Sequence, residues 1–237
     1  DDFAAMLDPE LPSLVPQSDG LPIVRGRRRT RAVVQPADGK LPYTAAGREE
    51  AAKPPPAGSS DNPEQRPNAE RCLVGQGQPP LSSFALDSEI QIIRTRDAVV
   101  IHVEYGDDVR IVPLTKTHAP RALWSRLGDS IGHWEGKTLV VETVGQPDAD
   151  RVHIAPTLIV PGEATVVERF TPISDGELLY QFTVVDPKVY ARPWLGEFSW
   201  FRTAMPMYEH ACHEGNYSLP NVLAGARHDE AAKLAAR

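Results

Sequence analysis

Apolar and polar residues alternate along much of the chain between Ile90 and Cys212, in short segments rich in Val, Ile and Thr. A period of two gives each segment one apolar face, and β-branched residues favour extended backbone. Asp175-Gly176, between two such segments, is a strong hairpin signal. We therefore predict strands over Ile90–Arg94, Ala98–Tyr105, Val109–Leu114, Thr138–Thr143, Ala164–Thr171, Glu177–Val185, Gly196–Thr203 and Pro206–Cys212.

The number and spacing of these strands predict the fold class. About eight short strands, with few helical patterns between them, favour a mainly β fold in which an antiparallel sheet closes, or nearly closes, into a barrel. A barrel of this size either fills its interior with side chains or holds one small ligand. We assign residues 89–226 to the barrel, and a sandwich of two sheets is the alternative. Pro120–Leu127 is expected to form a short helix.

Residues 1–88 lack this periodicity and are rich in proline and glycine. We expect a long irregular arm that packs on the barrel, with Pro54-Pro55-Pro56 in an exposed loop. Val33-Val34 and Leu41-Pro42-Tyr43 flank the turn signal Asp38-Gly39 and predict a short hairpin. Ala45–Ala52 is expected to form one or two helical turns. Residues 227–237 are expected to form a C-terminal tail.

Charge and hydropathy limit the classes of partner. The chain has 237 residues, with 25 Lys and Arg against 32 Asp and Glu, and a net charge of −7. An acidic chain lacks the electrostatic footprint of a nucleic-acid-binding protein, so we predict no nucleic-acid partner. Arg25–Arg31 is a local basic cluster. It is either a solvated turn or a contact site for an anionic partner. No apolar run approaches the roughly 20 residues of a membrane span.

Two cysteines, Cys72 and Cys212, permit one intramolecular disulfide, which would join the arm to the last predicted strand. Two reduced, buried thiols are the alternative. The first residue is Asp, and we expect that a signal peptide has been removed. A periplasmic or secreted location would allow the disulfide to persist.

The segment from Met207 to Tyr217 concentrates chemically active side chains. On a strand His210, Cys212 and Glu214 share one face and His213 lies on the other, so the spacing matches no helical zinc motif. A zinc site would need further ligands such as His102, His118, His133 or His153, and we predict neither a metal nor a cofactor. General acid–base chemistry is the better functional interpretation, with His213 paired to a strand carboxylate. A capping role for His213, Glu214 and Asn216 is the alternative.

Four titratable side chains stand on strands that have an apolar face: His102, Glu104, Glu142 and Glu168. Either they face solvent on a one-sided sheet or they line a polar pocket inside the barrel. Two further groups are candidate ligand-binding residues. His133 and Trp134 belong to a polar cluster before a strand, and Trp194 belongs to an aromatic group that can form the mouth of a barrel or simply pack at its rim. Tyr180, on the face of its strand that is apolar throughout, and Asn216 complete the predicted binding set.

A series of short motifs recurs in order along the chain: Arg71-Cys72, Gly132-His133-Trp134-Glu135-Gly136, Leu139-Val140-Val141-Glu142-Thr143, Glu168-Arg169-Phe170, Arg192-Pro193-Trp194 and Ala211-Cys212-His213-Glu214-Gly215-Asn216-Tyr217. The series resembles a widespread family of bacterial, often secreted proteins with a lipocalin-like β-rich domain. The resemblance implies a calycin-like barrel, export and the Cys72–Cys212 disulfide, and it implies no settled reaction. His210 departs from the aromatic residue expected there.

We therefore hypothesise an enzyme that works on a small organic molecule in a polar barrel pocket, without a cofactor, as a lyase, isomerase or hydrolase. His213 is the expected acid or base, assisted by Glu214. Glu104 or Glu142 would orient it, and Arg110 would hold an anionic group. A non-catalytic lipocalin-like binding protein is the alternative, and a structural module is a third possibility. The sequence leaves the substrate and the oligomeric state open.

Overall fold

The computed structural model describes residues 23–53, 60–68, 70–73, 76–81, 89–146, 160 and 162–236, and the backbone of 14–16, 152–155 and 158–159. The expected Pro54–Pro56 loop and the side chain of His153 lie outside these residues. The strands are β1 (Leu14–Pro16), β2 (Ile23–Val24), β3 (Arg27–Arg28), β4 (Val33–Gln35), β5 (Ile90–Arg94), β6 (Ala98–Val103), β7 (Asp108–Pro113), β8 (Asp129–Glu135), β9 (Thr138–Val144), β10 (Val152–Ala155), β11 (Leu158–Val160), β12 (Thr165–Ser174), β13 (Glu177–Val185) and β14 (Trp194–Arg202). The helices are α2 (Ala45–Ala51), α3 (Cys212–Gly215), α4 (Ser218–Ala235) and the 3₁₀ turns Pro63–Gln65 and Arg121–Leu123.

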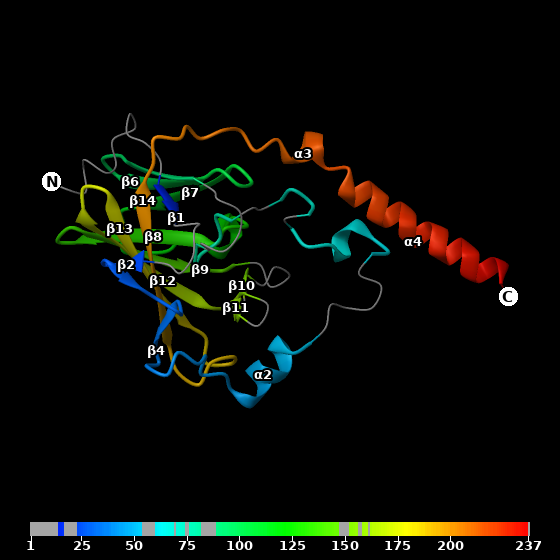
Figure 1. The fold of residues 1–237 in the computed structure, drawn as a ribbon, viewed down its shortest axis with the longest axis horizontal. Helices are drawn as coiled ribbons and strands as arrows, with labels where there is room; N and C mark the ends of the chain where they lie inside the picture. The colour runs from blue at the N-terminus through cyan, green and yellow to red at the C-terminus, as the bar shows by residue number, and fades with distance from the viewer. Residues whose placement is uncertain are drawn as a thin grey trace.

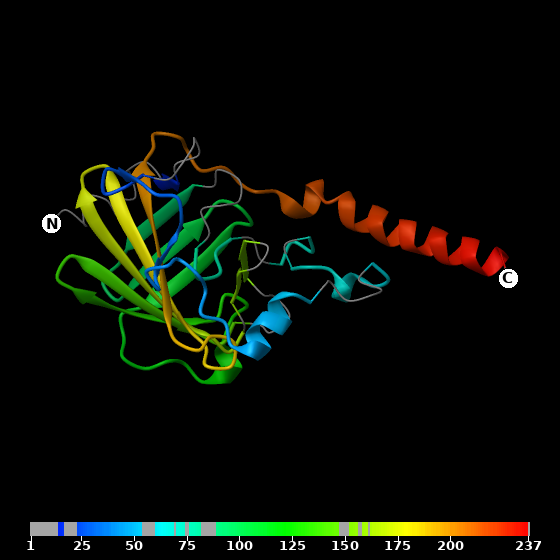
Figure 2. The same ribbon diagram turned by 60° about the horizontal axis from the view of Figure 1, so that its bottom comes forward.

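The fold is mainly β, as predicted, and its largest element is a ten-stranded antiparallel sheet. The strand order is β7-β6-β5-β1-β14-β13-β12-β9-β8, and β4 also pairs with β14. Hairpins connect β5 to β6, β6 to β7, β8 to β9 and β12 to β13. Asp175-Gly176 forms the last of these turns, as the sequence indicates. Figures 1 and 2 show the strands wrapped around one core, with α3 and α4 projecting away from it.

The sheet does not close into a barrel by strand pairing within the described residues, because its two end strands, β7 and β8, are not hydrogen-bonded to each other. Side chains meet at this seam instead. A Cβ added to Gly132 of β8 would lie 2.8 Å from Val112 Cγ1 of β7. The aliphatic side chain therefore packs directly on the glycine backbone.

Two differences from the predicted strands have clear physical reasons. Pro206–Cys212 is not a strand, since β14 already pairs with β13 along one edge and with β1 and β4 along the other. A further strand from this segment would have no free edge of β14 to join. Conversely, Asp129–Glu135, expected to be a polar cluster and turn, forms β8 with Ser130 and Gly132 buried.

The segments before residue 89 contribute strands as well as loops. Val33 pairs with β14 rather than with Leu41–Tyr43, so the hairpin expected around Asp38-Gly39 does not form. Tyr43 instead makes an isolated bridge to Tyr190, and the two rings stack with their centroids 4.9 Å apart. The predicted helical turns near Ala45 are α2, capped by the Thr44 hydroxyl oxygen. Residues 227–235 continue helix α4.

Large aromatic side chains fill the interior of the wrapped sheet. Tyr180 of β13 lies at their centre and stacks on Trp200 with a centroid separation of 4.6 Å. Burial of such rings is the main favourable contribution to folding, with about 1.5–3 kcal/mol for each large apolar side chain. Trp194, Trp200, Phe170, Phe182 and Phe198 are all at most 2% exposed.

A charged pair is buried within this apolar interior. Arg110 of β7 donates to both carboxylate oxygens of Glu168 on β12, at 2.6 and 3.0 Å, and the two side chains are 3% and 0% exposed. The Tyr180 hydroxyl donates to Glu168 at 2.8 Å and accepts the amide of Leu81 at 2.7 Å. Burial raises the pKa of Tyr180 well above its ordinary value, which keeps the phenol neutral and able to donate.

Removing one member of this pair should be strongly destabilising. We expect Glu168→Gln to lower the free energy of unfolding by about 3–5 kcal/mol, because the Arg110 charge is left buried without a counter-charge. Chemical denaturation measures the loss. The double variant R110M/E168M should recover part of it, since no buried charge then lacks a partner. A double variant that is no more stable than Glu168→Gln would contradict this interpretation.

Candidate functional site

The disulfide predicted between Cys72 and Cys212 is present. It joins residues 60–73 to the C-terminal segment, and the two segments lie side by side in Figures 1 and 2. Asn216 supports the junction: its amide donates to the Glu70 carbonyl at 2.7 Å, and its side-chain oxygen accepts the Leu219 amide at the start of α4. Further along α4, Arg227 donates to the Asp61 carbonyl at 2.6 Å.

Hydrogen bonds between described residues attach this disulfide-linked region to the turn between β6 and β7. Gln76 donates its amide to the Tyr105 carbonyl, and Gly77 donates to the Asp108 carboxylate at 2.8 Å. From the C-terminal side, the His210 amide donates to Asp107 at 3.1 Å. The His210 ring also lies against that of Tyr105, with a centroid separation of 4.5 Å.

A pocket of about 360 Å³ opens between this turn and the disulfide. We call it the disulfide pocket, and its walls combine two aromatic rings, a carboxylate and the disulfide. This volume is at the lower end of the range of small-molecule sites. The lining residues are Glu70, Tyr105, His210, Ala211, Cys212, Gly215, Asn216 and Ser218.

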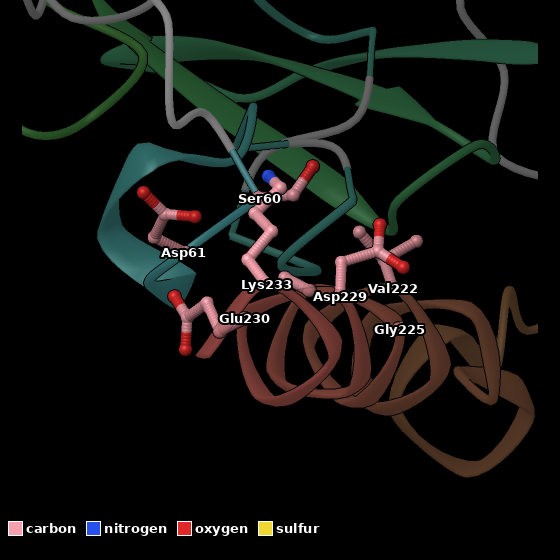
Figure 3. A pocket seen from close by; sticks show the side chains of 8 residues that line it. Ser60, Asp61, Val222, Gly225, Asp229, Glu230 and Lys233 are labelled. Atoms are coloured by element: carbon pink, nitrogen blue, oxygen red, sulfur yellow. The ribbon is translucent and has the colours of Figure 1, made fainter. Parts of the chain in front are cut away.

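A second, larger groove of about 460 Å³ lies between α4 and Ser60-Asp61, with the side chains of Asp229, Glu230 and Lys233 along it (Figure 3). The Glu230 carboxylate already accepts two hydrogen bonds from Arg227, at 2.7 Å each, and this contact lowers the pKa of Glu230. Glu230 is therefore already engaged, and the disulfide pocket, with its aromatic wall, is the better candidate site.

A carboxyl group with a shifted pKa lies next in sequence to Tyr105, which lines the disulfide pocket. Glu104 immediately precedes Tyr105 and stands opposite Glu89, which is 5% exposed. Desolvation by burial raises the pKa of Glu104 to about 7, and a side-chain hydrogen bond to Glu89 and charge repulsion by Glu89 add to the shift. A backbone hydrogen bond from Tyr208 opposes the shift. Two adjacent carboxyls of this kind hold a proton near neutral pH.

The structure separates the other predicted site residues into two groups. Arg110, Glu168, Tyr180 and Trp194 lie in the packed core. His102, Glu142 and His133 lie on the outer face, opposite the buried positions of their strands, whereas Trp134 shares the inner face of β8 with Ser130 and Gly132 and packs partly buried against the core. On the outer face His102 lies 3.7 Å from Asp107, and His133 lies 3.3 Å from Glu135. Trp134 packs under the Arg94 guanidinium.

His213 and Glu214 lie in the short helix α3 and are exposed. Within the described residues, the His213 side chain has no hydrogen bond or ion pair with a carboxylate. Glu104 and Glu142 therefore do not orient it. The Asn216 side chain holds the Glu70 carbonyl and the Leu219 amide of α4, and no strand is present at Pro206–Cys212 for it to cap.

Sequence reasoning missed two groupings that depend on tertiary contacts. His118 lies between Asp129 and Glu142, with ring nitrogens 2.6 and 3.1 Å from their carboxylate oxygens, and so ties the loop after β7 to β8 and β9. The contact between Glu89 and Glu104 was also missed. Glu89 directly precedes β5, and β5 pairs with β6, so the expected hairpin register could have placed Glu89 opposite Glu104.

The raised pKa of Glu104 makes stability depend on pH. The folded state keeps the proton up to about pH 7, whereas an unfolded glutamate releases it near pH 4.5. Between pH 4.5 and about pH 7, deprotonation of Glu104 therefore lowers the free energy of the unfolded state relative to the folded state. The free energy of unfolding should fall as the pH rises through this range. We expect Glu104→Gln to raise the free energy of unfolding at pH 8 by about 1–2 kcal/mol, with no gain at pH 4. Urea titrations at both pH values measure this, and an equal effect at pH 4 would contradict it.

The disulfide closes a loop with a sequence separation of 140 residues. The chain-entropy model assigns about 5 kcal/mol to a loop of that length. We expect the C72S/C212S double variant to lose several kcal/mol of stability, with faster hydrogen exchange concentrated in residues 60–73 and 203–236. The amides of β12 and β13 serve as the internal control. Unchanged exchange in the two linked segments would argue against this description.

Within the described residues, no helix is long and apolar enough to cross a membrane, and no group of histidine, cysteine and acidic side chains is arranged to hold a metal ion. Comparison with protein-family models, with curated proteins and with solved structures gives no match for this chain. The chemistry of the disulfide pocket and its surroundings is therefore the basis on which function is assigned.

Proposed function

We propose that this protein is a small-molecule enzyme that uses cofactor-independent acid–base chemistry, with its substrate in the disulfide pocket. The observation that carries the proposal is the Glu104 carboxyl, which has a pKa raised to about 7 and belongs to the residue directly before Tyr105 of that pocket. A group that titrates near the working pH is the most effective general acid or base, and such groups concentrate at functional sites.

Each neighbouring residue has a role in this proposal. Glu89 keeps Glu104 protonated near neutral pH through repulsion and a shared hydrogen bond. The rings of Tyr105 and His210 give the pocket an aromatic wall on which an organic substrate packs. The contact of the His210 amide with Asp107 holds that wall against the β6–β7 turn.

The proposal moves the acid–base role from His213 to Glu104. His213 is exposed, with no carboxylate paired to it in the described part of the chain. The Arg110 guanidinium is engaged by Glu168 in the core, so it supports the fold rather than a substrate anion. Proton transfer to or from a bound substrate is the common step of the lyase, isomerase and hydrolase reactions in the proposal.

We propose further that the protein is exported and that it belongs to the lipocalin-like family. A disulfide between segments remote in sequence is typical of an oxidising compartment, which supports a periplasmic or secreted protein. An antiparallel sheet wrapped around a core is compatible with a calycin-like protein. However, the described interior is filled with aromatic rings, which favours a ligand at the disulfide pocket over one inside the sheet.

A non-catalytic ligand-binding protein is the second candidate, and the pocket itself favours it. Both functions need the aromatic wall formed by Tyr105 and His210. Catalysis alone needs a titrating carboxyl at position 104, so variants at these positions separate the two.

Native mass spectrometry of freshly purified protein, followed by a thermal-shift screen of small organic molecules, should identify a ligand. We expect Tyr105→Ala to weaken its binding at least tenfold. Glu104→Gln should keep binding within about threefold and reduce turnover by about 10²–10⁴-fold, because the proton-transfer group is lost. His228→Ala, on the exposed face of α4, is the matched control. Wild-type turnover by Glu104→Gln would exclude the acid–base mechanism, and binding without turnover by the wild type would establish the second candidate.

A further inference from the structure

The basic cluster Arg25–Arg31 forms a hairpin on the outer face of the sheet. Strands β2 and β3 pair in register through Ile23 with Arg28 and Val24 with Arg27 (Figure 1). The turn residues Arg25 and Gly26 both have positive φ, 52° and 70°, as a type I′ turn requires. Asn, Asp or Gly is favoured at both positions of such a turn, so an arginine at the first is a conformationally unfavourable choice.

Part of the cluster anchors the hairpin to the body of the protein. Arg29 pairs with Glu197 of β14 at 2.8 Å, and Glu197 is 8% exposed and also accepts from Gln181. The Arg25 amide donates to Glu177 at 3.1 Å, and Val24 is buried at 1% exposure. The hairpin is therefore held in a defined position.

The remaining guanidinium groups are available to a partner. Arg25, Arg27 and Arg28 are exposed, and no described residue makes a hydrogen bond or an ion pair with their guanidinium groups. Successive strand residues point to opposite faces, so Arg27 and Arg28 diverge, and Arg25 lies at the turn. Three divergent cations cannot converge on one small anion. They can each contact a separate charge of an extended anion.

We infer that this hairpin binds a linear phosphate polymer through its backbone charges. Guanidinium groups match phosphate oxygens in a two-pronged geometry that lysine does not provide. A linear anion contacts the hairpin alone, whereas a flat anionic membrane also approaches the rest of a protein with a net charge of −7. The hairpin from Ile23 to Arg31 contains no aromatic residue on which nucleic-acid bases stack, which favours a polymer without bases.

The test is binding of long-chain inorganic polyphosphate to the full chain at several salt concentrations. We expect the logarithm of the association constant to fall with that of the salt concentration with a slope of about −2, the value for three contacts on a single-stranded polyanion. The variant R25Q/R27Q/R28Q should bind at least tenfold more weakly and with a slope near zero. The variant R96Q/R126Q/R192Q removes the same charge from exposed sites elsewhere and should bind within about twofold of the wild type.

Arg25→Asn separates binding from folding. Asparagine tolerates positive φ better than arginine, so this variant should have a higher melting temperature than the wild type and still bind polyphosphate more weakly. Equal losses in both triple variants would overturn the inference, because they would show a response to net charge alone. Tighter binding of single-stranded oligothymidylate or of phosphatidylglycerol vesicles than of polyphosphate, at matched phosphate and salt, would also overturn it.

Discussion

The buried ion pair between Arg110 and Glu168 is the interaction on which the rest of the architecture depends. Its members stand on β7 and β12, which the strand order separates widely, so their contact requires the sheet to wrap around. A buried charge without its counter-charge is strongly unfavourable, which ties the wrapping to this pairing. Tyr180 extends the network to the Leu81 amide and so holds a segment before β5 against the same core.

Because side chains fill the core, a ligand is expected to bind at the surface of the protein rather than inside the sheet. The aromatic rings around Tyr180 occupy the described interior, and the disulfide pocket lies outside it, where the β6–β7 turn meets the Cys72–Cys212 linkage. That turn holds both linked segments through Tyr105, Asp107 and Asp108. The carboxyl that titrates near neutral pH is the residue directly before this turn.

Local pattern predicted most of the sheet and less of the site. The sequence pattern placed β5, β6, β7, β9, β12, β13 and β14 close to their observed bounds, and buried positions alternate with more exposed ones most regularly in β6, β7 and β12. It failed at β8, whose Ser130 and Gly132 are buried without being apolar, and at Pro206–Cys212, where composition alone suggested a strand. Of the candidate residues, Glu104 has a shifted pKa, whereas His213 stands apart from the glutamates expected to orient it.

The sequence by itself determined the antiparallel β class, the DG hairpin and the one intramolecular disulfide that two cysteines permit, because these depend on periodicity, turn chemistry and counting. Tertiary structure alone decided which polar side chains meet. Glu168 shares the apolar face of its strand, yet only wrapping of the sheet brings Arg110 to it. Glu89 raises the pKa of Glu104 only because β5 and β6 pair in a register that sets them opposite each other, and a pKa is a property of such an environment rather than of a residue type.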